Sequence, residues 1–198
     1  DTFFSILSEK IQEVSRISFA DEIKMLGAQV FGIDIELFHD DDRKEQDVEI
    51  KWCTYNGDLS DKLTISPRKI MTSLGKAFRD MYSENFWIDK LFSKLGEKNG
   101  DNDNNIYVIT DMRYPNEARY VNGHCEKHIL VYIDADKRLG EMEEDAHESE
   151  KMVYKIREEM EKDLYVIENN TNLEDFKIKI HRFVREIKKM NKIGRAHV

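Results

Sequence analysis

Short apolar runs alternate with helical patterns through the chain, and this alternation constrains its fold more than any other feature. Each run has four to six mainly apolar residues, which is typical of a buried strand. The runs cover residues 16–19, 106–110, 128–133 and 164–167. Strands and helices in alternation predict an α/β fold, with a parallel sheet and helices on both faces.

The helical patterns have recognisable starts. Ser66 before Pro67 is a cap followed by proline at the first helical position, and Thr171 with Glu174 forms a capping box. Apolar residues at helical spacing predict helices around residues 1–14, 19–30, 67–81, 87–95 and 176–187.

Length and charge restrict the class of protein. At 198 residues the chain predicts one domain with one sizeable core. A formal charge of −9 disfavours a general surface for nucleic-acid polymers or anionic membranes. No apolar run approaches the roughly 18 residues of a membrane span, and two cysteines make no disulfide framework. We therefore expect a cytoplasmic protein whose partners are small molecules, with a homodimer left open.

The segment after the run at 106–110 contains the strongest candidates for chemistry. Asp111 stands at the strand end, Arg113 follows two positions later, and Glu117 begins a predicted helix. Ligands of such sheets bind beyond the carboxyl ends of the strands. The arginine could bind a phosphate through two hydrogen bonds, and the acids could hold a hydrated metal or a sugar. From the spacing alone, a surface ion pair with Glu117 as a helix cap is the favoured alternative.

Sequence motifs favour the functional interpretation of these residues over a surface ion pair. The stretch VITDMRYPNEA at 108–118 resembles the strand-end motif of the deoxynucleoside monophosphate kinases of the phage and viral type, members of the P-loop kinase superfamily. Further segments resemble this family in the same order, from residue 1 to about residue 192. They are DTFFSIL, SFADEIK, DDDRKE, SPRKIMTSLG, FWIDKL, DAHESE and LYVIENNTNLEDF. Residues 193–198 resemble a translated sequencing adapter and are expected to be a non-native tail.

The resemblance implies a three-layer P-loop kinase fold in a single domain over residues 1–192. In this family Asp and Thr follow the lysine of the phosphate loop, and here Asp1 and Thr2 open the chain. The first strand and most of the phosphate loop are therefore expected to be missing. Because that strand lies in the middle of the sheet, we expect the chain alone to be neither stable nor active.

The implied activity is phosphoryl transfer from ATP to a deoxynucleoside 5′-monophosphate, with Mg²⁺ as cofactor. The residues matched to catalysis are Arg113, Asp111 and Arg68. Those matched to the acceptor nucleotide are Arg43, Arg68, Trp87, Asp111, Arg113 and Glu117. Those matched to ATP are Asp1, Thr2 and Arg138, with Lys137 as a second lid cation and Asp1 reaching the metal through water.

Several positions favour other interpretations. Arg43 lies among acidic residues, which is typical of a solvated ion-pair cluster, and Trp87 on an apolar helix face is typical of a core residue. After Gly75 the chain departs from the family pattern, because Lys76 stands where a threonine is usual. Phosphomevalonate kinase is the closest competing family. A non-catalytic nucleotide-binding relative is the alternative from a different functional class.

Overall fold

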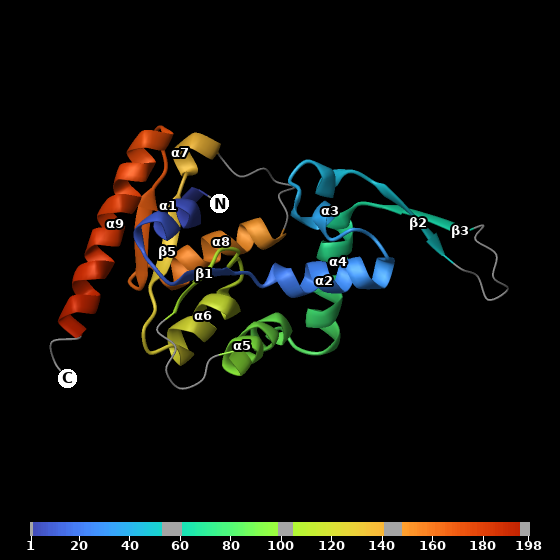
Figure 1. Cartoon of the computed structure of the whole chain (residues 1–198), viewed down its shortest axis with the longest axis horizontal. Helices are drawn as coiled ribbons and strands as arrows, with labels where there is room; N and C mark the ends of the chain where they lie inside the picture. Colours follow the sequence, from blue (N-terminus) through green and yellow to red (C-terminus); the bar gives the residue numbers. More distant parts are fainter. Residues whose placement is uncertain (1, 53–60, 99–104, 141–147, 195–198) are drawn as a thin grey trace. The chain divides into compact units, whose positions relative to one another are not determined.

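The computed structural model describes residues 2–52, 61–98, 105–140 and 148–194. It is a mixed α/β structure whose contacts divide the chain into two compact units (Figure 1). The first unit is drawn from residues 1–17 and 102–198, and the second from residues 18–101. The expectation of one domain over residues 1–192 stays a prediction.

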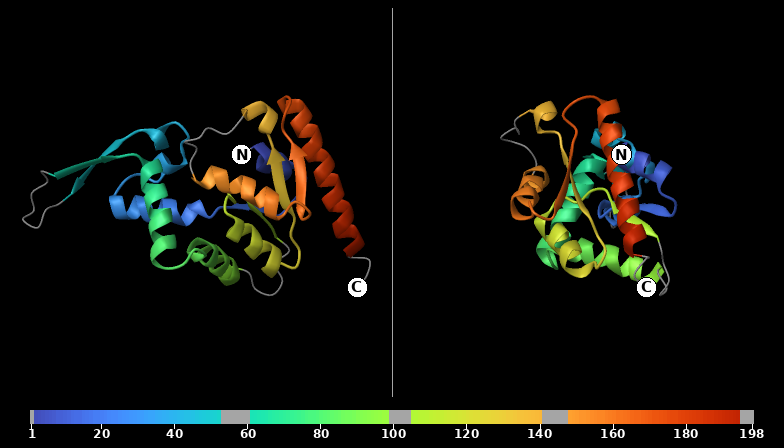
Figure 2. Two further views of the ribbon diagram at one scale, coloured as in Figure 1. Left: turned by 180° about the vertical axis from the view of Figure 1, so that it is seen from behind. Right: turned by 90° about the vertical axis from the view of Figure 1, so that its left-hand side faces the viewer.

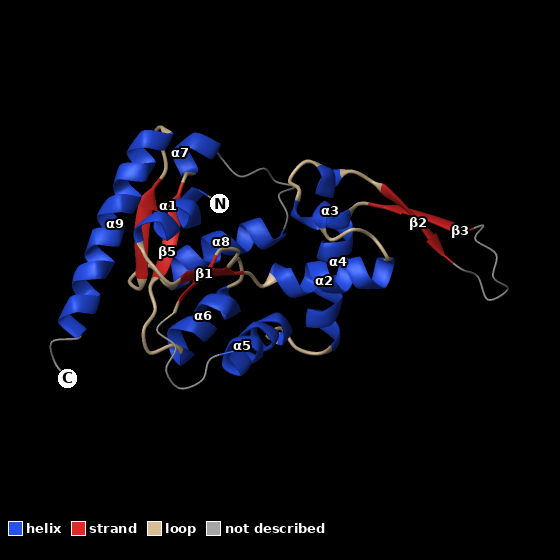
Figure 3. Ribbon diagram, viewed as in Figure 1, coloured by secondary structure: helices blue, strands red, loops and turns tan. Residues whose placement is uncertain are grey.

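The first unit contains two parallel strand pairs. Val14 of β1 pairs with Ile106 of β4, and Leu130 of β5 pairs with Leu164 of β6 (Figure 3). Within the described residues these pairs are separate, where the sequence predicted one parallel sheet. The elements are α1 (Thr2–Lys10), β1 (Val14–Ile17), β4 (Ile106–Ile109), α6 (Pro115–His124), β5 (Leu130–Asp134), α7 (Asp136–Leu139), α8 (Glu148–Glu159), β6 (Leu164–Glu168) and α9 (Leu173–Gly194).

The first helix and strand differ from the prediction. The helix expected over residues 1–14 ends at Lys10, and the strand expected at 16–19 begins two positions earlier. The chain leaves the helix at residues 11–13, and Glu13 there adopts a left-handed backbone conformation, with φ of 60°. Its carbonyl then accepts the N–H of Ile106 at 2.9 Å and starts the pairing with β4.

Helices cover both faces of the β5–β6 pair, as predicted. On one face, α1 and the apolar stripe of α9 pack with Ile167 of β6 into a buried cluster. On the other face lies α8, whose Arg157 guanidinium sits 5.1 Å from the centre of the Tyr132 ring. Figure 2 shows α9 running along the same strand pair when it is seen from behind.

The start of α9 differs by one residue from the predicted capping box. The side chain of Asn172 accepts the N–H of Asp175 at 2.9 Å, so Asn172 is the capping residue. Thr171 instead hydrogen-bonds the Asp175 carboxylate through its hydroxyl group. Both residues satisfy polar groups of the first helical turn, which explains why the sequence signal was ambiguous.

The second unit is mainly helical and carries an antiparallel hairpin that the sequence analysis missed. Val48 of β2 pairs with Ile65 of β3. Gly27 lets α2 lie close to its neighbours, because a Cβ there would sit 3.0 Å from the Ile70 side chain and 3.1 Å from Phe38. The elements are α2 (Ala20–Phe31), α3 (Glu36–His39), η1 (Arg43–Glu45), β2 (Val48–Trp52), β3 (Asp61–Ile65), α4 (Pro67–Met81) and α5 (Phe86–Lys98).

The predicted start of α4 is confirmed. The Ser66 side chain accepts the N–H of Lys69, and Pro67 occupies the first helical position. Phe38, Ile50 and Ile70 form the buried cluster beneath this helix and the hairpin. The unit therefore has its own apolar core.

Candidate functional site

The turn from β4 into α6 carries the candidate residues Asp111 and Arg113. Its backbone is fixed by Glu117, which is only 7% exposed. One carboxylate oxygen of Glu117 accepts the N–H of Arg113 at 2.7 Å and that of Tyr114 at 3.0 Å. Together with Pro115 at the first helical position, this ends the turn and starts α6. The alternative interpretation of Glu117 as a helix cap is confirmed, and its contact with the acceptor nucleotide stays a prediction.

The side chain of Arg113 has a partner that sequence reasoning missed. Its guanidinium donates to the hydroxyl of Ser149 at 3.3 Å, and Ser149 is buried at the start of α8. The two residues are 36 positions apart, so no local spacing could reveal the contact. The only available signal was the match of the surrounding DAHESE segment to the family. Arg113 is an exposed residue whose guanidinium contacts the start of α8.

A second group of polar side chains lies at the carboxyl ends of β5 and β6. The Asp134 carboxylate accepts the N–H of Asp136 at 3.1 Å and the Asn170 amide at 3.2 Å. These hydrogen bonds, with the nearby charge of Arg157, hold the pKa of Asp134 below its ordinary value. Asp134 is therefore an ionised anchor for the segments that follow both strands.

The two predicted lid cations follow Asp134 on α7. Arg138 donates from Nε to the carbonyl of Asn169 at 3.2 Å. The main-chain N–H of Lys137 donates to the side chain of Asn170 at 3.0 Å. Both side chains are exposed. The structure thus places both cations at the carboxyl end of β5, joined to the turn after β6.

The candidate acceptor-side arginines belong to the second unit. Arg68, in the first turn of α4, donates from Nε to the Glu45 carboxylate at 2.8 Å. This ion pair brings the start of α4 to η1, which carries Arg43. The N–H of Arg43 donates to Asp40 at 2.9 Å, and its side chain is exposed. Arg43 and Arg68 are thus brought to one part of this unit, among acidic residues.

Trp87 has a clear packing role. It is 5% exposed and its ring nitrogen donates to the carbonyl of Gly75 at 3.1 Å. Its ring also lies 5.3 Å from that of Phe78 on α4 and 5.0 Å from that of Phe86. Trp87 therefore joins α5 to α4, and its contact with an acceptor nucleotide stays a prediction.

Two sequence candidates lie at the start of the chain. Asp1, matched to ATP and the metal, lies outside the described residues. Thr2, also matched to ATP, is the exposed first residue of α1. Their assignment stays a prediction.

A family model for deoxynucleotide monophosphate kinase matches residues 8–180. This span includes the four strands that the structure describes in the first unit, and the whole of the second unit. The chain belongs to the deoxynucleotide monophosphate kinase family. No curated protein matches the chain.

Deoxynucleotide monophosphate kinases are phosphotransferases. Membership of this chain in the family implies ATP as co-substrate and, as a rule, Mg²⁺. In the part of the chain that the structure describes, no three His, Cys, Asp or Glu side chains gather as a metal site. Magnesium in such enzymes is held by one or two carboxylates, water and the substrate phosphates. A single carboxylate at a strand end, such as Asp111, fits that mode of binding.

In the described ranges, no helix of this kinase is both long enough and apolar enough to cross a membrane.

Proposed function

We propose that this kinase transfers the γ-phosphoryl group of ATP to the 5′-phosphate of a deoxynucleoside monophosphate. The observation that supports it most directly is the setting of Arg113. Its backbone is fixed by the buried Glu117 carboxylate, and its guanidinium extends from the carboxyl end of β4 to Ser149. A fixed arginine at that end of a strand suits a phosphate whose charge changes during the reaction.

The chemistry follows from the charges of the reactants. An oxygen of the acceptor phosphate is already ionised and attacks the γ-phosphorus of ATP, forming a new P–O bond while the bond to the β-phosphate breaks. ADP leaves with the electron pair of that bond. The protein therefore needs no general base, and its task is to align two polyanions and stabilise the transferring group.

Arg113 is proposed to stabilise the transferring phosphoryl group. Arg43 and Arg68 would bind the acceptor phosphate, and Arg68 would exchange the carboxylate of Glu45 for a phosphate oxygen. Arg138 would contact ATP. Asp111 is the described residue proposed to hold Mg²⁺, which would neutralise the charge of the ATP phosphates.

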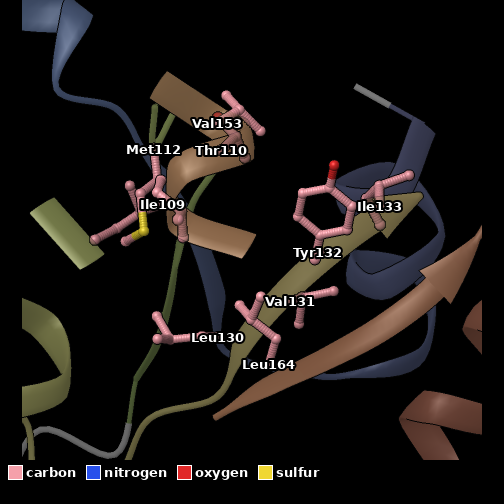
Figure 4. Close-up of a pocket in the computed structure, with 10 residues that line it drawn as sticks. Ile109, Thr110, Met112, Leu130, Val131, Tyr132, Ile133, Val153 and Leu164 are labelled. Atoms are coloured by element: carbon pink, nitrogen blue, oxygen red, sulfur yellow. The ribbon is translucent and has the colours of Figure 1, made fainter. Parts of the chain in front are cut away.

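The space between β4 and β5 supports one further strand of the P-loop fold. A cavity of about 250 Å³ lies there, lined mostly by apolar side chains including Ile109, Val131 and Ile133 (Figure 4). The N–H of Ile106 donates to Glu13, just before β1, and that of Thr110 donates to Ile17 of β1. By the alternation of a parallel ladder, Ile109 therefore turns its main chain to the other edge. We propose that one further parallel strand completes the sheet in this gap.

The proposed strand has a direct test. The chain extended by its upstream coding sequence should melt at a higher temperature than the 198-residue chain, and the amides of Ile109 and Val131 should become protected from hydrogen exchange. A cooperative, equally stable melt of the 198-residue chain would contradict the expected dependence on an added strand.

The activity is tested by coupled ADP release from the extended protein, with ATP and Mg²⁺. Each of the four deoxynucleoside monophosphates and phosphomevalonate is offered in turn. Turnover with a nucleotide supports the proposal and identifies the base. Turnover with phosphomevalonate alone, or silence with every acceptor from a folded protein, contradicts it and favours a phosphomevalonate kinase or a non-catalytic nucleotide-binding protein respectively.

A further inference from the structure

Arg157, on α8, joins three elements of the first unit. Its guanidinium donates to the Asp136 carboxylate at 2.7 Å and to the Asp134 carboxylate at 3.3 Å. The same group lies over the ring of Tyr132, 5.1 Å from its centre. One side chain of α8 therefore contacts the end of β5 and the start of α7.

The two carboxylates extend this contact to the turn after β6. Asp134 also accepts the side-chain amide of Asn170, whose oxygen in turn accepts the main-chain N–H of Lys137. The N–H of Asn169 donates to the carbonyl of Asp134. As a result, the segment that carries Lys137 and Arg138 is held from α8 on one side and from the turn after β6 on the other.

The geometry of Arg157 suits this role better than binding a substrate. Its side chain is 38% exposed, whereas that of Asp134 is 16% exposed. A planar guanidinium can donate to two carboxylates at once, and such charge-assisted hydrogen bonds are stronger and more directional than an exposed ion pair. Arg157 is bound by two carboxylates at once, whereas Arg68 pairs with one, so we assign Arg157 to holding the end of β5 and the start of α7 together.

We propose that Arg157 is a positioning residue for ATP: it fixes α7 against the turn after β6 and so sets where Arg138 and Lys137 meet the nucleotide. The part of this inference that concerns ATP binding rests on the proposed function. The positioning part stands on the contacts of Arg157, Asp134 and Asn170 alone.

The positioning part is tested by hydrogen exchange in the protein extended by its upstream coding sequence, because the 198-residue chain alone is expected to be unstable. Arg157→Ala should make the amides of Lys137 and Asn169 exchange at least about tenfold faster, because a charge-assisted anchor is lost. Arg157→Lys should restore part of the protection. The matched control is Arg119→Ala, which removes an ion pair to Glu159 on the exposed surface of α8 and should leave both amides unchanged.

The ATP part is tested by steady-state kinetics of the extended protein. Arg157→Ala should raise KM for ATP about tenfold and leave KM for the acceptor within about twofold. Asn170→Ala, which removes the acceptor of the Lys137 amide, should reproduce this split if Arg157→Ala fails to fold.

Opposite results overturn the inference. Unchanged exchange at Lys137 and Asn169 in Arg157→Ala shows that the guanidinium does not hold α7. Equal rises in both KM values, or a change in kcat alone, show a general structural role. Absence of turnover in the unsubstituted protein contradicts the proposed function and with it the ATP part, while the exchange data still decide the positioning part.

Discussion

The carboxylate of Glu117 accepts the main-chain N–H of Arg113 at 2.7 Å, so the residue that starts α6 also fixes the backbone of the arginine before it. Glu117 is buried and accepts the N–H of Tyr114 as well. One side chain thus links the stability of the helix to the position of the guanidinium.

Glu117→Ala should lower the free energy of unfolding by about 2 to 3 kcal/mol, because two main-chain donors lose their acceptor in a buried site. Glu117→Gln keeps an oxygen acceptor and should lose less. Urea unfolding of the extended protein measures both, with the exposed Glu159→Ala as control. Equal stability of Glu117→Ala and the unsubstituted chain would show that the hydrogen bonds contribute nothing.

Arg113→Ala should reduce kcat/KM of the active protein at least about a hundredfold, since a charged donor to a transferring phosphoryl group is lost. Its melting temperature should change little because the side chain is exposed. Arg113→Lys should recover only part of the activity, as lysine cannot donate through a planar fork. Near-normal turnover of the alanine variant would remove Arg113 from the active site.

Trp87→Phe should destabilise the second unit by about 1 to 2 kcal/mol. The substitution keeps an aromatic ring in the cluster but leaves the buried carbonyl of Gly75 without the indole N–H that it accepts. Tyr82→Phe, at a residue 66% exposed, is the matched control and should be close to neutral. The measurement is chemical denaturation; a neutral Trp87→Phe would show that the hydrogen bond is dispensable.

The stability of the chain should depend on the ionisation of Asp134. Its folded pKa lies below the ordinary value of 3.8, so its contribution is complete above that pH and is lost as the pH falls through the lowered pKa. Asp134→Asn should therefore cost about 1 to 2 kcal/mol at pH 7, and the gap to the unsubstituted chain should narrow below about pH 4. Thermal melts across this range measure the effect, and a gap independent of pH would contradict it.

Strand positions were predictable wherever the apolar run was continuous. β4, β5 and β6 lie within two residues of their expected starts because their runs of apolar residues are continuous, even though Val166 of β6 is 45% exposed. β1 was displaced because the left-handed backbone of Glu13 is invisible in an apolar pattern. The β2–β3 hairpin was missed although Val48, Ile50 and Trp52 alternate with charged residues, which is the ordinary signal of a half-buried strand.

The candidate site was predictable in its residues and less so in their contacts. The strand-end position of Asp111 and Arg113 followed from the order of motifs. The contacts of Arg113 with Ser149 and of Arg157 with Asp134 could not follow, because they join positions 36 and 23 apart through tertiary packing. Long-range partners of this kind leave no periodic signal in a single sequence.

The backbone of Glu13 also offers a way to prepare the protein for experiments. A non-glycine residue with φ of 60° carries a steric penalty that glycine avoids. Glu13→Gly would relieve that penalty and give up some entropy of the unfolded chain, for a net gain of roughly 0.5 to 1 kcal/mol. Since Glu13 lies at the junction that starts the β1–β4 pairing, this single change is a simple starting point for making a sturdier sample for crystallisation.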